Sequence, residues 1–416
     1  MVENWALTDL YTAFYYMSDR SGKTHSWRRA ANQQMNKFVF NCSINVLGGG
    51  VQESVNFILE SLKDGTVEWN YIVSPQVKRE LDRYDVHLDN SLVVERSPAR
   101  SRATRSYLAR HVKELGVDAV LTLAGPAYVD FGPPHLMGIA NAFITHASLG
   151  VLFRSGWIHA LTVIYRTLFV RKSDAWLFQT ASAKKGFARR FRVPEDSCYV
   201  VPNSIGRNYS TKGLGMENTL ATGPEDTEVV VLVPAADYPH KNVRIVPEIA
   251  HSLRSLIPAP GVVRFLLTLP ENSETWKAVR SESDRLNVSD MIENHGPFSI
   301  NDGPELYARA HIMLLPTKLE TFSANYLEAM ATNRLIITSN KDFARDVCGN
   351  GALYFEPDRP SECARQIADA ISNPAQCQEL LRRGRERLDQ FPDIAGRYAL
   401  IKKALEDMIP PGKSAR

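Results

Sequence analysis

Ile312-Met313-Leu314-Leu315-Pro316 is an apolar run, and Glu320-Thr321-Phe322-Ser323-Ala324-Asn325-Tyr326-Leu327-Glu328 follows it after three residues. The run predicts a buried β-strand. The second segment, which continues Ala329-Met330-Ala331, predicts the opening turns of a helix that carry both glutamates. A helix N-terminus presents unpaired N–H groups and a partial positive charge that suit a phosphate. Carboxylates beside it can accept hydrogen bonds from sugar hydroxyls, so this stretch predicts a site for a nucleotide sugar.

Length and composition indicate a globular protein of two domains. The chain has 416 residues, of which 44% are hydrophobic and 23% charged, enough for two domains of about 200 residues each. No apolar run approaches the roughly 18 residues that span a bilayer, and the first 36 residues show no secretory signal. We therefore expect a cytoplasmic protein, with a peripheral position at the inner face of the cell membrane as an open alternative.

The cysteines and the distribution of charge further restrict the possible classes of protein. No two of the five cysteines form a C-x-x-C pair, which argues against a disulfide framework or a zinc site. Residues 1–204 hold 24 Lys+Arg against 18 Asp+Glu, a net +6, and the remainder holds 25 against 28, a net −3. The basic first half suggests an anionic partner, although the excess is too small for a nucleic-acid-binding arm.

Short apolar runs alternate with helical stretches along the whole chain. Such a pattern predicts βα units with buried parallel sheets. The expected strands cover residues 37–47, 69–73, 92–95, 119–123, 136–139, 176–179, 199–202, 229–233, 263–269, 312–315, 335–338 and 353–355. The predicted fold class is α/β, with two doubly wound, Rossmann-like domains in tandem that face a cleft.

Turn-forming residues set the expected domain limits. Val201-Pro202-Asn203-Ser204 and the Gly/Thr/Asn-rich stretch that follows predict the hinge. We expect an N-terminal helical extension over residues 1–36, a first domain over 37–204, a second over 205–393, and a last helical segment over 394–416. The extension either packs on the first domain or contacts a partner or membrane.

Two further segments follow predicted strands. Gly48-Gly49-Gly50 lies between a strand and a helical stretch, where glycines let the backbone approach a phosphate, although a tight turn alone would also need them. Lys241 follows residues 229–233, at the edge where doubly wound folds bind ligands. It could neutralise a diphosphate leaving group, or it could be an ordinary exposed lysine. Helix-dipole stabilisation explains Glu320 well and Glu328 poorly.

These residues together resemble a GT-B glycosyltransferase of the large retaining group called family 4, or glycosyl transferases group 1. The resemblance covers roughly residues 37–410, and the last helix is expected to cross back onto the first domain. It is carried by Gly48-Gly49-Gly50, Val201-Pro202-Asn203, Lys241, and the E-x7-E pattern of Glu320 and Glu328 with Ala329-Met330.

The resemblance implies a role for each of these positions. Lys241 and the amides near Thr321, Phe322 and Ser323 would hold the donor diphosphate. Glu328 would accept hydrogen bonds from the ribose hydroxyls, and Glu320 would lie beside the transferred sugar as a catalytic residue. Gly49 and Gly50 would close over phosphate or acceptor from the first domain. Transfer would retain the anomeric configuration and need no metal or other cofactor; the sequence contains no D-x-D triplet.

The chain departs from the family at three points. Ala235-Ala236-Asp237-Tyr238 occupies the turn where related chains carry an arginine, and Ser204 replaces the linker glycine. The family also places a catalytic histidine after a first-domain strand. Here His135 precedes the strand at 136–139 and His146 follows it, so His146 is the favoured candidate, with a structural histidine as the alternative.

Basic and apolar residues in the first half bear on the acceptor. Arginines and a lysine crowd one predicted helix, namely Arg100, Arg102, Arg105, Arg110 and Lys113. A second helix carries an apolar face of Trp157, Ile158, Leu161, Ile164, Tyr165, Leu168 and Phe169, flanked by Arg154, Arg166, Arg171 and Lys172. This pattern fits docking on an anionic membrane and a lipid-diphosphate-linked acceptor, or a core-facing helix with a solvated basic side.

The leading hypothesis is a retaining glycosyltransferase that extends a glycan or lipid-linked glycan in cell-surface polysaccharide or O-antigen synthesis. A nucleotide-sugar epimerase is the alternative enzyme, and it would act without an acceptor. A catalytically silent GT-B scaffold within a glycan-assembly complex is the non-enzyme alternative. Donor base, donor sugar and acceptor stay open.

Overall fold

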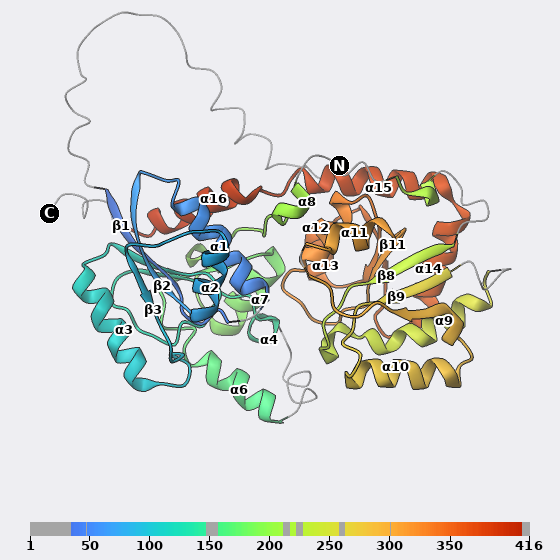
Figure 1. Cartoon of the computed structure of the whole chain (residues 1–416), viewed down its shortest axis with the longest axis horizontal. Helices are drawn as coiled ribbons and strands as arrows, with labels where there is room; N and C mark the ends of the chain where they lie inside the picture. Colours follow the sequence, from blue (N-terminus) through green and yellow to red (C-terminus); the bar gives the residue numbers. More distant parts are fainter. Residues whose placement is uncertain are drawn as a thin grey trace, which may run out of the picture.

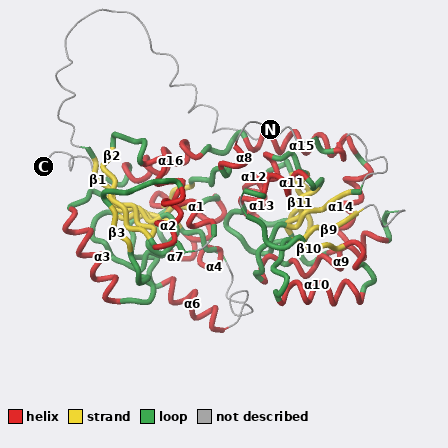
Figure 2. The backbone as a smooth tube through the Cα atoms, in the orientation of Figure 1, coloured by secondary structure: helices red, strands yellow, loops and turns green. Residues whose placement is uncertain are grey.

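The computed structural model describes residues 35–46, 48–146, 157–210, 217–221, 228–257, 263–299 and 301–409. The chain forms two α/β domains, each built around a parallel sheet with helices on both faces (Figure 1). The predicted fold class is confirmed. In Figure 2 the strands of each domain form a group of their own, with helices around it. The expected helical extension lies almost wholly outside the described residues.

The first sheet has seven strands in the order β3-β2-β1-β4-β5-β6-β7. Its strands are β1 (Asn36–Cys42), β2 (Val67–Val73), β3 (Ser91–Val93), β4 (Ala119–Thr122), β5 (His135–Gly138), β6 (Ala175–Phe178) and β7 (Cys198–Val200). Its helices are α1 (Gly49–Ser61), α2 (Pro75–Arg83), α3 (Arg102–Leu115), α4 (Ala142–Thr145), α6 (Trp157–Thr167) and α7 (Ala181–Phe191); α8 (Arg207–Ser210) follows in the linker.

The second sheet has six strands in the order β10-β9-β8-β11-β12-β13. Its strands are β8 (Val229–Val233), β9 (Val263–Leu267), β10 (Ile292–Asn294), β11 (Ile312–Leu315), β12 (Leu335–Ser339) and β13 (Ala352–Phe355). Its helices are α9 (Val246–Arg254), α10 (Glu274–Arg285), α11 (Gly303–Ala308), α12 (Ala324–Ala331), α13 (Asp342–Cys348), α14 (Pro360–Ser372) and α15 (Pro374–Leu388).

Both sheets are buried on both faces, which explains why their strands read as continuous apolar runs. Along β1, Val39 packs into one hydrophobic core, while Phe38 and Phe40 pack into the core on the opposite face. Successive side chains of a strand point to opposite faces, so both faces need apolar residues here. The pattern therefore identified every strand except β10, a three-residue edge strand with a single apolar residue.

Local turns move some element limits away from the sequence prediction. β1 ends at Cys42 rather than at residue 47, because Asn45 N donates to Cys42 O at 3.0 Å and closes a turn. Gly49 and Gly50, expected in that turn, are the first two residues of α1. The helix that carries Glu328 begins only at Ala324, so Glu320 lies in the loop before it and not on its opening turns.

The last helix, α16 (Ile394–Glu406), returns from the second domain and packs along the first (Figure 1). Tyr398 and Ile401 enter the hydrophobic core of the first sheet, and Trp69 Nε1 donates to Tyr398 Oη at 3.0 Å. Arg397 forms an ion pair with Glu53 and donates to Pro202 O at 3.0 Å. This helix therefore fixes the linker against the first domain.

No helix in the described part of the chain combines the length and the hydropathy needed to cross a bilayer.

Candidate functional site

Each sheet reverses its strand order at one point, and the loops at these points build the site. The order reverses between β1 and β4 in the first sheet and between β8 and β11 in the second. Doubly wound folds bind ligands outside the carboxyl ends of the strands at such switch points. A cavity of about 700 Å³ lies between the domains there. Its lining residues are Gly125, Ala140, Asn141, Ala142, Phe143, Arg166, Tyr238, Pro239, His240, Leu319, Glu320 and Thr321.

Lys241 and Glu320 meet at the second-domain side of this cavity. Lys241 ends a short 3₁₀ turn (Pro239–Lys241) after β8, and its ammonium pairs with the Glu320 carboxylate. Lys318 N donates to His240 O at 2.8 Å, which holds the loops after β8 and β11 together. The structure therefore brings together two residues that are 79 positions apart in sequence.

No side chain of the described residues caps the N-terminus of α12. Ser323 is its N-cap residue and its side chain makes no capping hydrogen bond, and the first turn contains no acid. Asn325 Nδ2 donates to Pro234 O at 2.9 Å and fixes the helix against the loop after β8. The first amides of the helix and Lys241 therefore belong to one group of loops, which suits a diphosphate.

Thr321 and Phe322 hold the loop before α12 in place. Thr321 Oγ1 donates to Ala140 O at 3.0 Å, and Thr180 Oγ1 donates to Thr321 O at 3.1 Å, so both bonds join the two domains. The Phe322 side chain is buried and contacts Phe391, with 6.1 Å between ring centres. Both side chains thus have structural partners, and any contact of this segment with a donor would come from its main chain.

Glu328 lies deeper, within the second domain. Burial raises the pKa of its carboxyl to about 7, and the Tyr307 hydroxyl partly offsets this effect. Glu328 also helps to raise the pKa of Tyr209, after burial as the larger cause. Tyr209 and Tyr307 pack edge to face, with ring centres 5.8 Å apart. Glu328 thus interacts with both tyrosines, and its carboxyl oxygens could accept hydrogen bonds from a ligand.

His146 joins the two domains directly at Glu320. Its Nε2 lies 2.8 Å from Glu320 O, and its Nδ1 lies 2.9 Å from Thr145 Oγ1. Burial lowers its pKa, which favours a neutral ring that donates to the carbonyl. Gly186 on α7 makes this position possible, since a Cβ there would lie 2.9 Å from His146 Cβ. His146 is therefore next to the proposed catalytic residue, in a position to orient it.

His135 is a structural histidine. It lies on β5, 2% exposed, with Nε2 2.9 Å from Thr122 Oγ1 and Nδ1 3.1 Å from Lys172 O. Burial lowers its pKa to about 4. Both ring nitrogens have partners within the first domain, so His135 is excluded as the active-site histidine.

Sequence reasoning missed three residues that line the cavity. Asn141 and Phe143 follow β5, and the Phe143 ring packs edge to face on His240, with centres 5.7 Å apart. Arg166 comes from α6 on the first domain. The rule that ligands bind at the carboxyl ends of strands could have found Asn141. Nothing in the sequence links Arg166 to the cavity, because only packing brings α6 there.

Gly49 and Gly50 are not among the residues that line this cavity. A Cβ at Gly49 would meet no atom within 4 Å, and one at Gly50 would only contact the Asn45 side chain. Their contact with phosphate or acceptor stays a prediction.

The apolar face of α6 points outward, which makes the alternative of a core-facing helix wrong. Trp157 is 68% exposed, Ile158 65% and Leu168 67%, while Ala160 and Val163 are buried. Tyr165 and Phe169 instead pack near Tyr128. Arg171 donates to Phe191 O at 2.7 Å and Lys172 pairs with Asp130. Arg154 lies outside the described residues.

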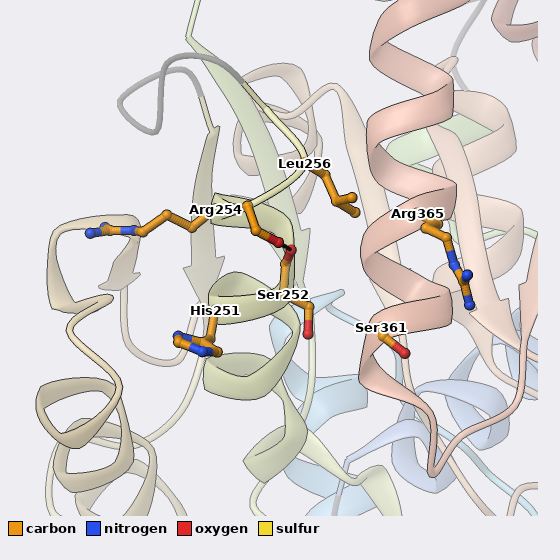
Figure 3. A pocket seen from close by; sticks show the side chains of 7 residues that line it. His251, Ser252, Arg254, Leu256, Ser361 and Arg365 are labelled. Atoms are coloured by element: carbon orange, nitrogen blue, oxygen red, sulfur yellow. Dashed lines mark hydrogen bonds between the residues drawn. The ribbon is translucent and has the colours of Figure 1, made fainter.

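A further hollow of about 530 Å³ lies between α9 and α14, in the second domain (Figure 3). His251 Nδ1 lies 3.3 Å from Leu286 O, and the Arg254 side chain pairs with Asp290. His251 and Arg254 thus have partners away from the hollow, and the Arg365 side chain is directed away from α9 in Figure 3.

Comparison with known proteins finds a family match in the second domain. Residues 220–387 match the family model of glycosyl transferases group 1. The O-antigen chain mannosyltransferase RfbU of Salmonella typhimurium (strain LT2) is 24% identical over 209 residues, which cover 49% of this chain and 54% of that protein. The chain thus matches about half the length of this curated relative.

Solved structures share the fold over most of this chain. A glycosyltransferase from Rickettsia africae ESF-5 has a TM-score of 0.68 at 14% identity, over 91% of this chain and 100% of that one. Anabaena Alr3699/HepE, in complex with UDP and glucose, has a TM-score of 0.66 at 15% identity, over 89% and 100%.

The two doubly wound domains have the GT-B fold. The match to glycosyl transferases group 1 lies within the second domain.

Proposed function

We propose that the chain is a retaining glycosyltransferase that moves a sugar from a nucleotide-sugar donor to a glycan or lipid-linked glycan acceptor. One observation carries the proposal: Lys241 pairs with Glu320, which precedes the uncapped N-terminus of α12 and lines a cavity together with first-domain residues. In this proposal the cation and the main-chain amides bind the diphosphate, and the carboxylate lies beside the sugar. The acceptor hydroxyl enters through the space that the two domains share. The proposed reaction needs no metal or other cofactor.

In the proposed transfer, the bond between the anomeric carbon and the donor phosphate oxygen breaks. A bond from that carbon to an acceptor oxygen forms on the same face of the sugar, and the hydroxyl proton passes to the departing diphosphate. Lys241 and the amides of Ser323 and its neighbours would stabilise the charge that develops on the diphosphate. Glu320 would stabilise positive charge on the sugar ring, and Glu328 would bind the ribose hydroxyls.

Cell-surface polysaccharide or O-antigen synthesis is the proposed context. The matching relative from Salmonella is an O-antigen chain mannosyltransferase, and the exposed face of α6 suits a position at a membrane. Trp157, Ile158, Leu161 and Leu168 would enter the interface of an anionic leaflet, with the protein on the cytoplasmic side.

The test begins with the donor. Thermal shift with UDP-, GDP-, ADP- and dTDP-linked sugars identifies the nucleotide, because a bound ligand raises the melting temperature. Release of the nucleoside diphosphate is then measured with and without glycan acceptors. Lys241→Ala is expected to raise the donor Kd roughly 10- to 100-fold, because a charge-assisted hydrogen bond contributes about 1.5–3 kcal/mol.

Lys277→Ala is the matched control, since Lys277 forms an exposed ion pair with Glu274 on α10. If Lys241→Ala and Glu328→Ala leave binding and turnover unchanged, the site assignment is wrong. Turnover of the donor without any acceptor would favour an epimerase. Donor binding without turnover by any acceptor would favour a silent scaffold.

A further inference from the structure

A second cavity, of about 1100 Å³, adjoins the interdomain cavity on the first domain. It lies at the carboxyl ends of β1, β3 and β4, around the switch point of the first sheet. Gly125 and Arg166 line both cavities, so the two spaces meet at these residues. We call it the arginine pocket, because Arg96, Arg100, Arg102 and Arg166 line it.

Carboxylates of the described residues do not neutralise the charges of the arginine pocket. Glu95 is its single carboxylate, against four guanidinium groups. Within the described part of the chain, none of the four arginines forms an ion pair with a carboxylate. Like charges that share one concave surface repel each other and raise the local concentration of anions. The pocket is therefore suited to an anionic ligand.

The start of α3 points to the same chemistry. Ser101, its N-cap residue, lines the pocket, and the first turn contains no acid but instead Arg102 and Arg105. Helix N-termini favour acids, so basic residues there are unfavourable unless an anion lies nearby. Arg105 has a separate task, since it donates to Pro98 O at 2.8 Å and to Tyr165 Oη at 2.8 Å. It fixes the loop that carries Arg96 and Arg100 against α6.

Arg166 is held at the junction of the two cavities. Its guanidinium lies near the Tyr128 hydroxyl, and Tyr128 also lines the arginine pocket. The Tyr128 ring in turn packs against Phe169, with 5.1 Å between ring centres, and against Tyr165, at 6.1 Å. An anion that contacts Arg166 would lie in the arginine pocket and still border the space that Glu320 lines.

We infer that the arginine pocket binds a phosphate or diphosphate group of the acceptor. This inference rests on the proposed function and gives it a substrate class: the acceptor is phosphorylated. Arginine suits this ligand because its planar donors bind phosphate in a bidentate manner. With the phosphate in the pocket, the rest of the acceptor extends past Arg166 and Gly125 towards the donor sugar. The phosphate belongs either to a lipid carrier or to a soluble sugar phosphate.

The test measures binding to the full chain with its donor site filled by a saturating nucleoside diphosphate. Farnesyl diphosphate serves as the lipid probe, glucose 1-phosphate as the soluble probe, and farnesol as the uncharged control. We expect the preferred phosphorylated probe to bind, farnesol to bind much more weakly, and Arg100→Ala/Arg102→Ala to raise the Kd by about tenfold or more. Which of the two probes binds identifies the source of the phosphate.

Arg110→Ala is the matched control, because Arg110 is an exposed arginine on α3 that does not line the pocket. Equal affinity of the wild type and the double variant, equal losses in Arg110→Ala, or failure of both probes to bind would overturn the inference. If instead the proposed function is wrong, the wild type will bind no nucleotide. In that case the same probes are titrated without nucleotide into the Lys241→Ala variant, in which binding at the donor site is excluded.

Discussion

The Lys241 ammonium and the Glu320 carboxylate form an ion pair where the loops after β8 and β11 meet. Their side chains are only 13% and 19% exposed, so each charge loses much of its hydration and depends on the other. An incoming diphosphate would compete with Glu320 for the same ammonium. In the proposed mechanism, the pair would link donor binding to the release of a carboxylate beside the reacting sugar.

Glu320→Gln separates binding from chemistry. We expect the donor Kd to change little or to fall, because Lys241 is no longer paired, while kcat drops roughly tenfold to hundredfold as the charge beside the sugar is lost. Steady-state kinetics and calorimetric titration of the nucleotide measure the two effects. Glu274→Gln, which breaks the exposed pair with Lys277, is the control. An unchanged kcat would contradict the role of Glu320.

Glu328 makes the stability of the free protein depend on pH. Its pKa is raised from 4.5 to about 7 in the folded chain, so folding binds a proton between these values. The contribution to stability is fully present below about pH 4.5 and is lost as pH rises through 7, by up to about 3 kcal/mol. Denaturant unfolding at pH 5.5 and pH 8 measures the free energy of unfolding, which should fall less between these pH values for Glu328→Gln than for the wild type. Parallel losses would refute the raised pKa.

The same carboxyl should release a proton when nucleotide binds. Ribose hydroxyls donate to a carboxylate, so a bound nucleotide favours the ionised form and lowers the pKa. Donor affinity is therefore expected to rise between pH 6 and pH 8, with proton release visible by calorimetry in buffers of different ionisation enthalpy. Glu328→Gln should remove both effects, whereas a pH dependence that persists in this variant would have another origin.

Gly186 keeps His146 against Glu320. A methyl group at Gly186 would lie 2.9 Å from both His146 Cβ and Thr145 O, so Gly186→Ala forces α4 and α7 apart. We expect a loss of about 1–3 kcal/mol in the free energy of unfolding, together with a lower kcat as the His146–Glu320 hydrogen bond lengthens. Gly65→Ala is the control, because no atom lies within 4 Å of a Cβ there. Equal stability of the two variants would show that α7 can shift freely.

The outward face of α6 is expected to bind anionic membranes. Burial of a leucine contributes about 1.5–3 kcal/mol, so Leu161→Glu and Leu168→Glu should each weaken binding to phosphatidylglycerol vesicles by roughly tenfold or more. Thr162→Glu adds the same charge at an exposed polar position of the same helix and is the control. Co-sedimentation measures the bound fraction. A wild type that stays in the supernatant would exclude this surface.

The sequence predicted most of the fold because buried parallel strands need apolar residues on both faces. Val229–Val233 and Ile312–Leu315 lie where their composition places them. The prediction from sequence missed β10, whose residues are mostly polar. It also placed the start of α12 too early, because hydrogen bonds of Thr321 to the other domain hold the preceding loop. A local pattern carries no information about such distant partners.

For the site, the sequence by itself determined the chemical groups: two glutamates, a lysine and a helix start, each beside a strand end. These are local features, set by residue type and spacing. Only the tertiary structure decided that Lys241 pairs with Glu320, that His135 is buried while His146 meets Glu320 O, and that Arg166 joins two cavities. Each of these depends on how helices and sheets distant in sequence pack together, because packing alone fixes which side chains become neighbours.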